Sequence, residues 1–131
     1  EKDSSLNIEF IHSLKTAKLI QVALTMPYLG NEIYNKTQVL LNEIGGKIGI
    51  AFQIMDDVLE VSSDSTTLGK SNLSDINNKK MTYVSVYGLE ESIHKAEALS
   101  SFCIQQVQEN FELNKSNQLV ELMNLMVSRS N

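Results

Sequence analysis

The sequence predicts an all-α fold formed by a single domain of 131 residues. Apolar residues recur at three- and four-residue spacing through most of the chain, which is the period of a helix. One Pro and six Gly are few, and no segment alternates convincingly between polar and apolar residues as a strand does. The length fits one domain, since domains typically run to roughly 100–200 residues.

A first helix is predicted over residues 7–26, and Pro27 follows it directly. A second helix is predicted over residues 34–61, where the helical period persists for several turns. Three glycines lie inside it, at Gly45, Gly46 and Gly49. Because each glycine costs up to ~1 kcal/mol of helix propensity relative to Ala, we expect a close backbone contact at this place.

The apolar pattern is lost over residues 62–80, which we interpret as a long loop of the kind that often serves as a binding loop. A short helical turn is then expected over residues 81–87, with a break at Gly88. The remaining elements are a third long helix over residues 89–113, a turn at residues 114–116, and a last amphipathic helix marked by Leu119, Leu122, Met123 and Met126.

The charge balance and the apolar content exclude several functions. Sixteen Asp and Glu residues outnumber eleven Lys and Arg residues, which argues against a nucleic-acid partner. An anionic ligand is still possible, because a local lysine cluster can act against the net charge. No apolar run approaches the ~20 residues that span a bilayer, so no membrane association is expected. The single cysteine, Cys103, and the absence of a secretory signal favour a cytoplasmic location.

The most informative stretch is Ala51–Glu60. On a helix, Gln53, Asp56, Asp57 and Glu60 are three or four residues apart and share one face. Adjacent acids in a long apolar helix repel one another unless a cation neutralises them, and Mg²⁺ prefers carboxylate oxygens and is often shared with phosphates. The alternative, that these acids form a solvated face near a helix end, has about equal weight on spacing alone.

Lysines supply a second signal. Lys15 and Thr16 lie inside the first predicted helix, while Lys70, Lys79 and Lys80 lie in or beside the predicted loop. Lysines in a glycine-bearing loop suit a segment that closes over a phosphate group. Taken singly, each lysine is more simply explained as a solvated side chain.

Three motifs together resemble one family. They are IHSLKT at residues 11–16, GIAFQIMDDVLEV at residues 49–61 and TLGKSNLSDINNKKMTY at residues 67–83. In order and spacing they resemble the C-terminal half of a short-chain trans-prenyl diphosphate synthase, and most of all a bacterial farnesyl diphosphate synthase. This resemblance implies the helical bundle of the isoprenoid synthases. It also implies Mg²⁺-assisted condensation of an allylic diphosphate with isopentenyl diphosphate, giving a farnesyl-type diphosphate and pyrophosphate, in an enzyme that is commonly a homodimer.

The resemblance assigns a metal site to the second motif. Asp56 matches the aspartate that binds Mg²⁺, and Asp57 matches its neighbour, which supports the metal directly or through water. Glu60 stands at the third acidic position, where the family usually has Asp. Because Glu is one methylene longer, we expect its contact with metal or water to be altered but not abolished.

The resemblance also assigns substrate contacts. The lysines that match contacts to the allylic diphosphate are Lys15, Lys70 and Lys80. Lys79 is an alternative to Lys80, since the loop spacing of the family varies by one residue. Thr16 and Gln53 match residues whose oxygens face the ionising carbon and stabilise its positive charge.

The chain also departs from the family by omission. It has no first aspartate-rich motif and no Arg-Arg pair, since its single arginine is Arg129. We therefore expect residues 1–131 to be the C-terminal part of a synthase, inactive alone, which associates with an N-terminal half or with another copy. The alternative is a truncated, noncatalytic partner that regulates a full-length synthase. A purely structural helical module is the least favoured interpretation, because three separate motifs agree.

Overall fold

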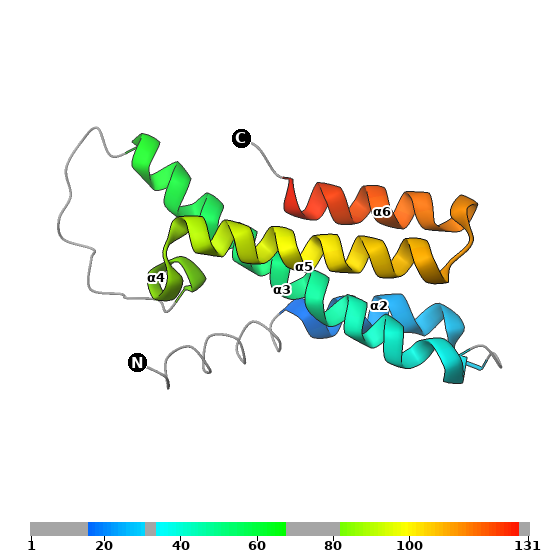
Figure 1. Ribbon diagram of the computed structural model, residues 1–131. Helices are drawn as coiled ribbons and strands as arrows, with labels where there is room; N and C mark the ends of the chain where they lie inside the picture. The colour runs from blue at the N-terminus through cyan, green and yellow to red at the C-terminus, as the bar shows by residue number, and fades with distance from the viewer. Residues whose placement is uncertain (1–15, 31–33, 68–81, 129–131) are drawn as a thin grey trace.

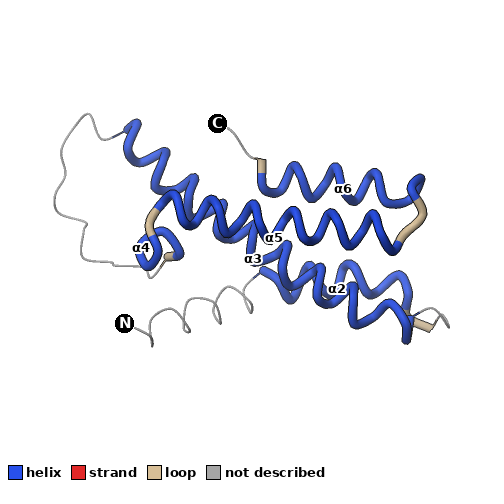
Figure 2. The backbone as a smooth tube through the Cα atoms, in the orientation of Figure 1, coloured by secondary structure: helices blue, strands red, loops and turns tan. Residues whose placement is uncertain are grey.

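The computed structural model describes residues 16–30, 34–67 and 82–128, and it leaves the side chains of residues 34–36, 63–67 and 113–116 undescribed. Every regular element in these ranges is helical, which confirms the all-α class (Figures 1 and 2). The elements are α2 (Lys18–Thr25), the short 3₁₀ helix η2 (Met26–Tyr28), α3 (Tyr34–Thr67), α4 (Tyr83–Tyr87), α5 (Leu89–Asn110) and α6 (Leu113–Val127).

The long helix α3 is the centre of the arrangement. It packs against α2 along its first half and crosses α5, while α6 returns antiparallel beside α5 (Figure 1). The short α4 lies near the start of α5 and contacts both α3 and α5. None of the described helices is long and apolar enough to cross a membrane.

Apolar side chains of α3 form the middle of the core. Ile44, Ile48 and Ile54 are almost completely buried, and the first two are four residues apart on one face of the helix. Residues of the other helices close the core around them, including Tyr83 of α4, Cys103 and Val107 of α5 and Met123 of α6. Burial of apolar area is the dominant favourable contribution to such a core.

The predicted close contact at the glycines is confirmed. A Cβ atom added to Gly49 would lie 2.4 Å from Ala17 Cα, and one added to Gly45 would lie 2.8 Å from Gln21 Cα. The two glycines are four residues apart and so face the same helix, α2. The backbones of α2 and α3 therefore touch directly, with no side chain of α3 between them at these points.

The predicted loop over residues 62–80 begins later than expected, because α3 continues through Thr67. Within this extension the hydroxyl of Ser62 donates to the carbonyl oxygen of Val58, four residues earlier, at 2.8 Å, so its polar group is satisfied inside the helix. The apolar period could not locate this helix end, because residues 62–67 include no strongly apolar side chain. Residues 68–81 lie outside the described residues.

The predicted turn at residues 114–116 is wrong, since α6 already begins at Leu113. The third long helix ends at Asn110, and the chain bends at Phe111 and Glu112, whose ψ angles are 149° and 136°. Phe111 is half-buried against the core. The break is thus associated with an aromatic side chain that packs inward, not with the polar residues that follow it.

The other boundaries agree closely with expectation. The short helix expected over residues 81–87 is α4, which begins after a capping box formed by Thr82 and Ser85. Gly88 separates α4 from α5 with φ +86°, a conformation that side-chain-bearing residues rarely adopt. Of the first predicted helix, the part within the described residues is α2, which passes into η2 at Met26.

Candidate functional site

Five of the predicted site residues lie in the described part of the chain. Thr16 precedes α2, and Gln53, Asp56, Asp57 and Glu60 lie on the second half of α3. The lysines expected to contact diphosphate, Lys15, Lys70 and Lys80, with the alternative Lys79, all lie outside the described residues. The site can therefore be built only from its α2, α3 and α4 sides.

Thr16 and Gln53 are in direct contact although they are 37 positions apart. The Thr16 hydroxyl donates to Gln53 Oε1 at 3.1 Å. Residues 16–17 form a π-helical turn immediately before α2, a distortion that often occurs at functional sites. The structure thus brings together the two oxygens that the resemblance assigns to the ionising carbon.

Gln53 is held from its other end by Asp57. Its Nε2 donates to Asp57 Oδ1 at 3.4 Å, and both side chains are buried, with 5% and 6% exposed. An ionised carboxylate can accept hydrogen bonds but cannot donate them. The Asp57 side chain therefore selects the amide orientation that places Gln53 Nε2 toward Asp57 and Oε1 toward Thr16. Asp57 therefore fixes where the Gln53 oxygen lies.

The second oxygen of Asp57 reaches α4. Asp57 Oδ2 accepts a hydrogen bond from the backbone N–H of Tyr83 at 2.9 Å. This N–H belongs to the first residue of α4 and has no partner within its own helix. The carboxylate also complements the positive end of that helix.

Sequence reasoning missed Tyr83 as a neighbour of the site. The residue is 2% exposed, and its ring stacks obliquely on that of Tyr87, with 4.8 Å between ring centroids. Its place as the last residue of the third motif was a signal, but nothing in the local pattern pairs it with an acid 26 positions earlier.

The four residues of the predicted acidic face differ in environment. Gln53 and Asp57 are buried, Asp56 is half-buried, and Glu60 is exposed. Figure 1 shows the last stretch of α3 running past the end of α2, so α2 does not cover this stretch as it covers the first half of α3. Glu60 thus fits the interpretation of a solvated acid better than Asp57 does.

The carboxylates of this face are the candidate ligands for Mg²⁺. Among the described residues, no three His, Cys, Asp or Glu side chains gather closely enough to hold a metal ion by themselves. Mg²⁺ in phosphate-binding enzymes is, however, usually held by one or two carboxylates, waters and the phosphates themselves. Asp56 fits such a shared ion, with Asp57 beside it, whereas an all-protein cage does not fit this arrangement.

Comparison with known proteins agrees with this geometry. Residues 2–123 match the family model described as polyprenyl synthetase. The chain therefore belongs to the polyprenyl synthetase family.

Individual relatives are similar over most of the chain. It is 34% identical over 134 residues to "Geranylgeranyl diphosphate synthase" of Cyanophora paradoxa, a match that covers 100% of this chain and 43% of the relative. It is 43% identical over 93 residues to "Farnesyl diphosphate synthase" of Micrococcus luteus, covering 70% of this chain and 32% of the relative. A chloroplastic geranylgeranyl pyrophosphate synthase of Arabidopsis thaliana is 34% identical over 125 residues, or 95% of this chain and 34% of the relative.

Two facts follow from these similarities. The predicted family is confirmed, but relatives named for farnesyl and for geranylgeranyl products both match, so the family does not fix the product. The chain spans 32% to 43% of the length of these three relatives.

Proposed function

We propose that this chain forms the diphosphate-activating wall of a prenyl diphosphate synthase. The whole enzyme would join an allylic diphosphate, dimethylallyl or geranyl diphosphate, to isopentenyl diphosphate. Its products would be a farnesyl-type diphosphate and pyrophosphate. The observation that carries this proposal is the series of hydrogen bonds from Thr16 through Gln53 to Asp57, which orients the Thr16 and Gln53 oxygens within the family motifs.

The reaction requires charge to separate in a dry site. The allylic carbon–oxygen bond breaks, and both of its electrons leave with the diphosphate. The double bond of isopentenyl diphosphate then supplies the electrons of the new carbon–carbon bond, and a proton is lost. Preorganised dipoles that face the developing charges lower the barrier of such a step, and exclusion of water protects the cation.

Thr16 and Gln53 supply the dipoles on the carbon side. Thr16 uses its proton on Gln53, so the lone pairs of its hydroxyl oxygen can face positive charge. The Gln53 oxygen faces the Thr16 hydroxyl because Asp57 holds the amide nitrogen, and its remaining lone pair can also face positive charge. Both groups are fixed before substrate arrives, so little reorganisation is needed when the carbon ionises.

The leaving group needs cations on the opposite side. Asp56, with Asp57 and Glu60 nearby, would hold Mg²⁺, which when bound supplies positive charge to the departing pyrophosphate. Lys15, Lys70 and Lys80, or Lys79 in place of Lys80, would complete the charge compensation. These lysine contacts are predictions from the resemblance.

The farnesyl product is supported by the Micrococcus luteus relative, whose identity of 43% exceeds that of the two geranylgeranyl relatives compared above, over a shorter stretch. We further propose that the chain functions as a homodimer or together with an N-terminal half. The exposed apolar side chains of α2 support this association, since Leu19 and Val22 are 74% and 50% exposed. A cytoplasmic location stays a prediction from the sequence.

Calorimetry with Mg²⁺ and pyrophosphate tests the diphosphate site directly. We expect binding that requires both components and that Asp56→Ala weakens by about tenfold or more. Glu43→Gln, which alters an exposed acid at the other end of α3, is the matched control and should bind normally. If binding is absent even when an N-terminal half is supplied, or if Asp56→Ala binds like the unmodified chain, the site is wrong.

The product proposal needs a separate measurement. The complete enzyme is incubated with labelled isopentenyl diphosphate and geranyl diphosphate, and the chain length of the dephosphorylated product is measured. A fifteen-carbon alcohol is expected, whereas a twenty-carbon alcohol would replace the farnesyl assignment and leave the diphosphate site intact.

A further inference from the structure

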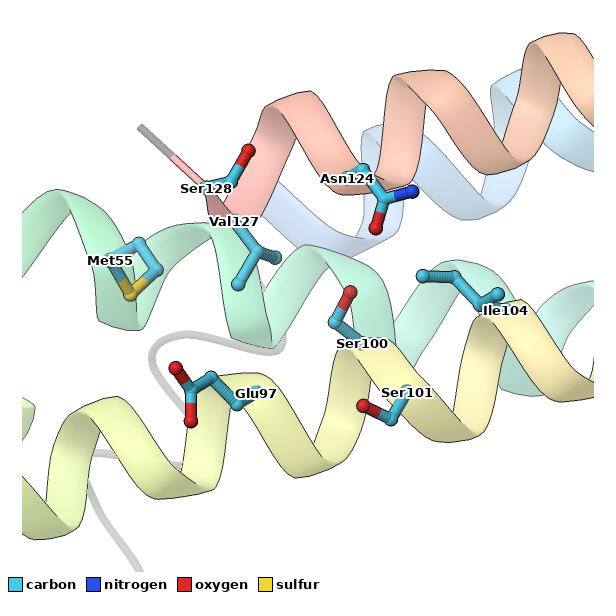
Figure 3. Close-up of a pocket in the computed structure, with 8 residues that line it drawn as sticks. All are labelled: Met55, Glu97, Ser100, Ser101, Ile104, Asn124, Val127 and Ser128. Atoms are coloured by element: carbon cyan, nitrogen blue, oxygen red, sulfur yellow. The ribbon is translucent and has the colours of Figure 1, made fainter. Parts of the chain in front are cut away.

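A pocket lies between α5 and α6 and is closed on one side by Met55 of α3 (Figure 3). Its volume is about 210 Å³, and none of its lining residues belongs to the hydrogen-bonded series of Thr16, Gln53 and Asp57. The lining residues used below are Met55, Glu97, Ser100, Ile104, Asn124 and Val127. Neither the sequence motifs nor the proposed reaction explains this pocket.

Ser100 is the unusual member of the lining. Its side chain is only 5% exposed, yet its hydroxyl makes no hydrogen bond within the described part of the chain. Buried helical serines normally bond to the carbonyl four residues earlier, as Ser92 on the same helix does with Gly88 at 2.6 Å. Because a buried hydroxyl without a partner is unfavourable, Ser100 is best explained by a guest that pairs with it.

The direction of the side chains agrees with a shared guest. Figure 3 shows Ser100 reaching from α5 toward α6, and Asn124 reaching from α6 toward α5. The side chains of Met55, Ile104 and Val127 supply apolar walls. A guest that fits must therefore have a polar end and a short apolar body.

The charge of the pocket is negative. Glu97 lies one turn before Ser100 on the same face of α5, and it is the one ionisable residue in the lining. Helix α6 ends at Val127, so the negative end of its dipole lies at the pocket. A carboxylate and a helix carboxyl end together favour a cation, and a single carboxylate suits a monovalent group better than a divalent metal.

We propose that the α5–α6 pocket binds a primary alkylammonium group carried on a short apolar stem. The ammonium donates to the Glu97 carboxylate and to the Ser100 hydroxyl oxygen. The stem packs against Ile104 and Val127. An ammonium has three donors and no acceptor, which matches a lining of carboxylate, hydroxyl and amide oxygens.

The test uses the 131-residue chain with ¹³C-labelled methionine methyl groups, followed by NMR. n-Butylammonium chloride is titrated at constant ionic strength, and n-butanol serves as a neutral probe of nearly the same shape. We expect the Met55 methyl resonance, assigned with Met55→Leu, to shift saturably with the amine and not with the alcohol.

Two variants locate the binding contacts. Glu97→Gln should weaken amine binding by about tenfold, since it removes a charged hydrogen-bond partner, and Ser100→Ala should weaken it by about fivefold. Glu109→Gln, an exposed acid further along α5, should bind like the unmodified chain. Because Glu97 is exposed, its substitution should not disturb folding, which circular dichroism verifies.

Three results would overturn the proposal. Equal saturable shifts with the amine and the alcohol would show an apolar pocket without a cation site. No saturable Met55 shift in the folded chain would show that the pocket holds only water. Equal losses in Glu97→Gln and Glu109→Gln would show general electrostatic attraction to an acidic helix.

Discussion

The carboxylate of Asp57 accepts the backbone N–H of Tyr83 at 2.9 Å, which joins the middle of the longest helix to the first residue of α4. The same carboxylate accepts the Gln53 amide at 3.4 Å. One buried acid thus anchors a helix on one side and orients a proposed catalytic residue on the other. Its neighbour Asp56 is half-buried, so two adjacent acids of one motif lie in different environments.

This difference predicts opposite phenotypes for two alanine variants. Asp57→Ala leaves the Tyr83 N–H and the Gln53 amide buried without their acceptor, and should lower the free energy of unfolding by about 1–3 kcal/mol. Asp56→Ala should cost less stability than Asp57→Ala, because Asp56 is only half-buried, while weakening pyrophosphate binding. Urea unfolding followed by circular dichroism measures the first effect. Equal stability losses in the two variants would contradict the separation of roles.

The contact between α2 and α3 predicts that Gly49→Ala is strongly destabilising. The new methyl group would lie 2.4 Å from Ala17 Cα, so one helix backbone must move. Overpacking of this kind typically costs about 1–3 kcal/mol, and a clash with backbone belongs at the upper end.

Gly46→Ala is the matched control for that variant. Its methyl group would meet only the amide end of Gln21 at 3.0 Å, so the side-chain hydrogen bond from Gln21 to the Asn42 carbonyl must adjust but no backbone has to move. The gain in helix propensity of up to ~1 kcal/mol should offset much of this contact. A Gly46→Ala variant less stable than Gly49→Ala, by thermal or urea unfolding, would show that the two helices do not touch as described.

Cys103 predicts a pH dependence of stability in the alkaline range. Its side chain is fully buried, and burial raises the pKa of the thiol from 9.0 to about 12, although nearby Lys47 acts in the opposite direction. Above pH 9 the unfolded chain loses this proton while the folded chain retains it. The thiol therefore destabilises the fold progressively between pH 9 and 12, by at most about 1.4 kcal/mol per pH unit.

Comparison with Cys103→Ala isolates that effect from other groups that titrate at high pH. The free energy of unfolding of the unmodified chain should fall more steeply between pH 8.5 and 10.5 than that of the variant. Parallel slopes would mean that the thiol titrates normally and is therefore not buried in solution. The native thiol should also react slowly with disulfide reagents at pH 8, because its thiolate is scarce.

The apolar stripe that runs along α2 into the start of η2 predicts association between copies of the chain. Leu19, Val22 and Met26 recur at helical spacing and are 50% to 74% exposed. Sedimentation equilibrium should find a dimer or larger species for the unmodified chain. A variant carrying both Leu19→Lys and Val22→Lys should be largely monomeric, because charges would replace the apolar contact.

Leu125→Lys provides the control, since Leu125 is 68% exposed but lies on α6. It should leave the association unchanged. If the unmodified chain is a monomer, the stripe is not an interface. If Leu125→Lys alone dissociates the oligomer, the interface lies on α6 instead.

The sequence predicted the helices well where burial imposed a period. The long run through Ile44, Ile48 and Ile54 repeats because its side chains fill the core, and the glycines beside them indicated the contact with α2. The bend at Phe111 was missed because it accompanies inward packing of one aromatic side chain against the core, which only the tertiary structure defines. Local turn chemistry at residues 114–116 carried no information about that packing.

The candidate site was predicted in its composition and only partly in its arrangement. Three- and four-residue spacing correctly joined Gln53 to Asp57, since that contact lies within one helix. The contacts to Thr16 and Tyr83 span 37 and 26 positions, and they depend on how α2 and α4 pack on α3. Spacing alone therefore placed Asp57 and Glu60 in one environment, although the first is buried and the second is exposed.

The contact between Ala17 and Gly49 also fixes the spacing between the two chain segments that carry the site residues. Thr16 is the residue before Ala17, and Gln53 lies one turn after Gly49. The backbone contact holds the residues that carry the two oxygens at a fixed spacing, and the hydrogen bond between Thr16 and Gln53 then sets where the oxygens themselves lie. The side chains of this wall could therefore change one at a time during evolution. A substitution at Gly49, which has no chemical role itself, would shift the two backbones and displace all of these side chains together.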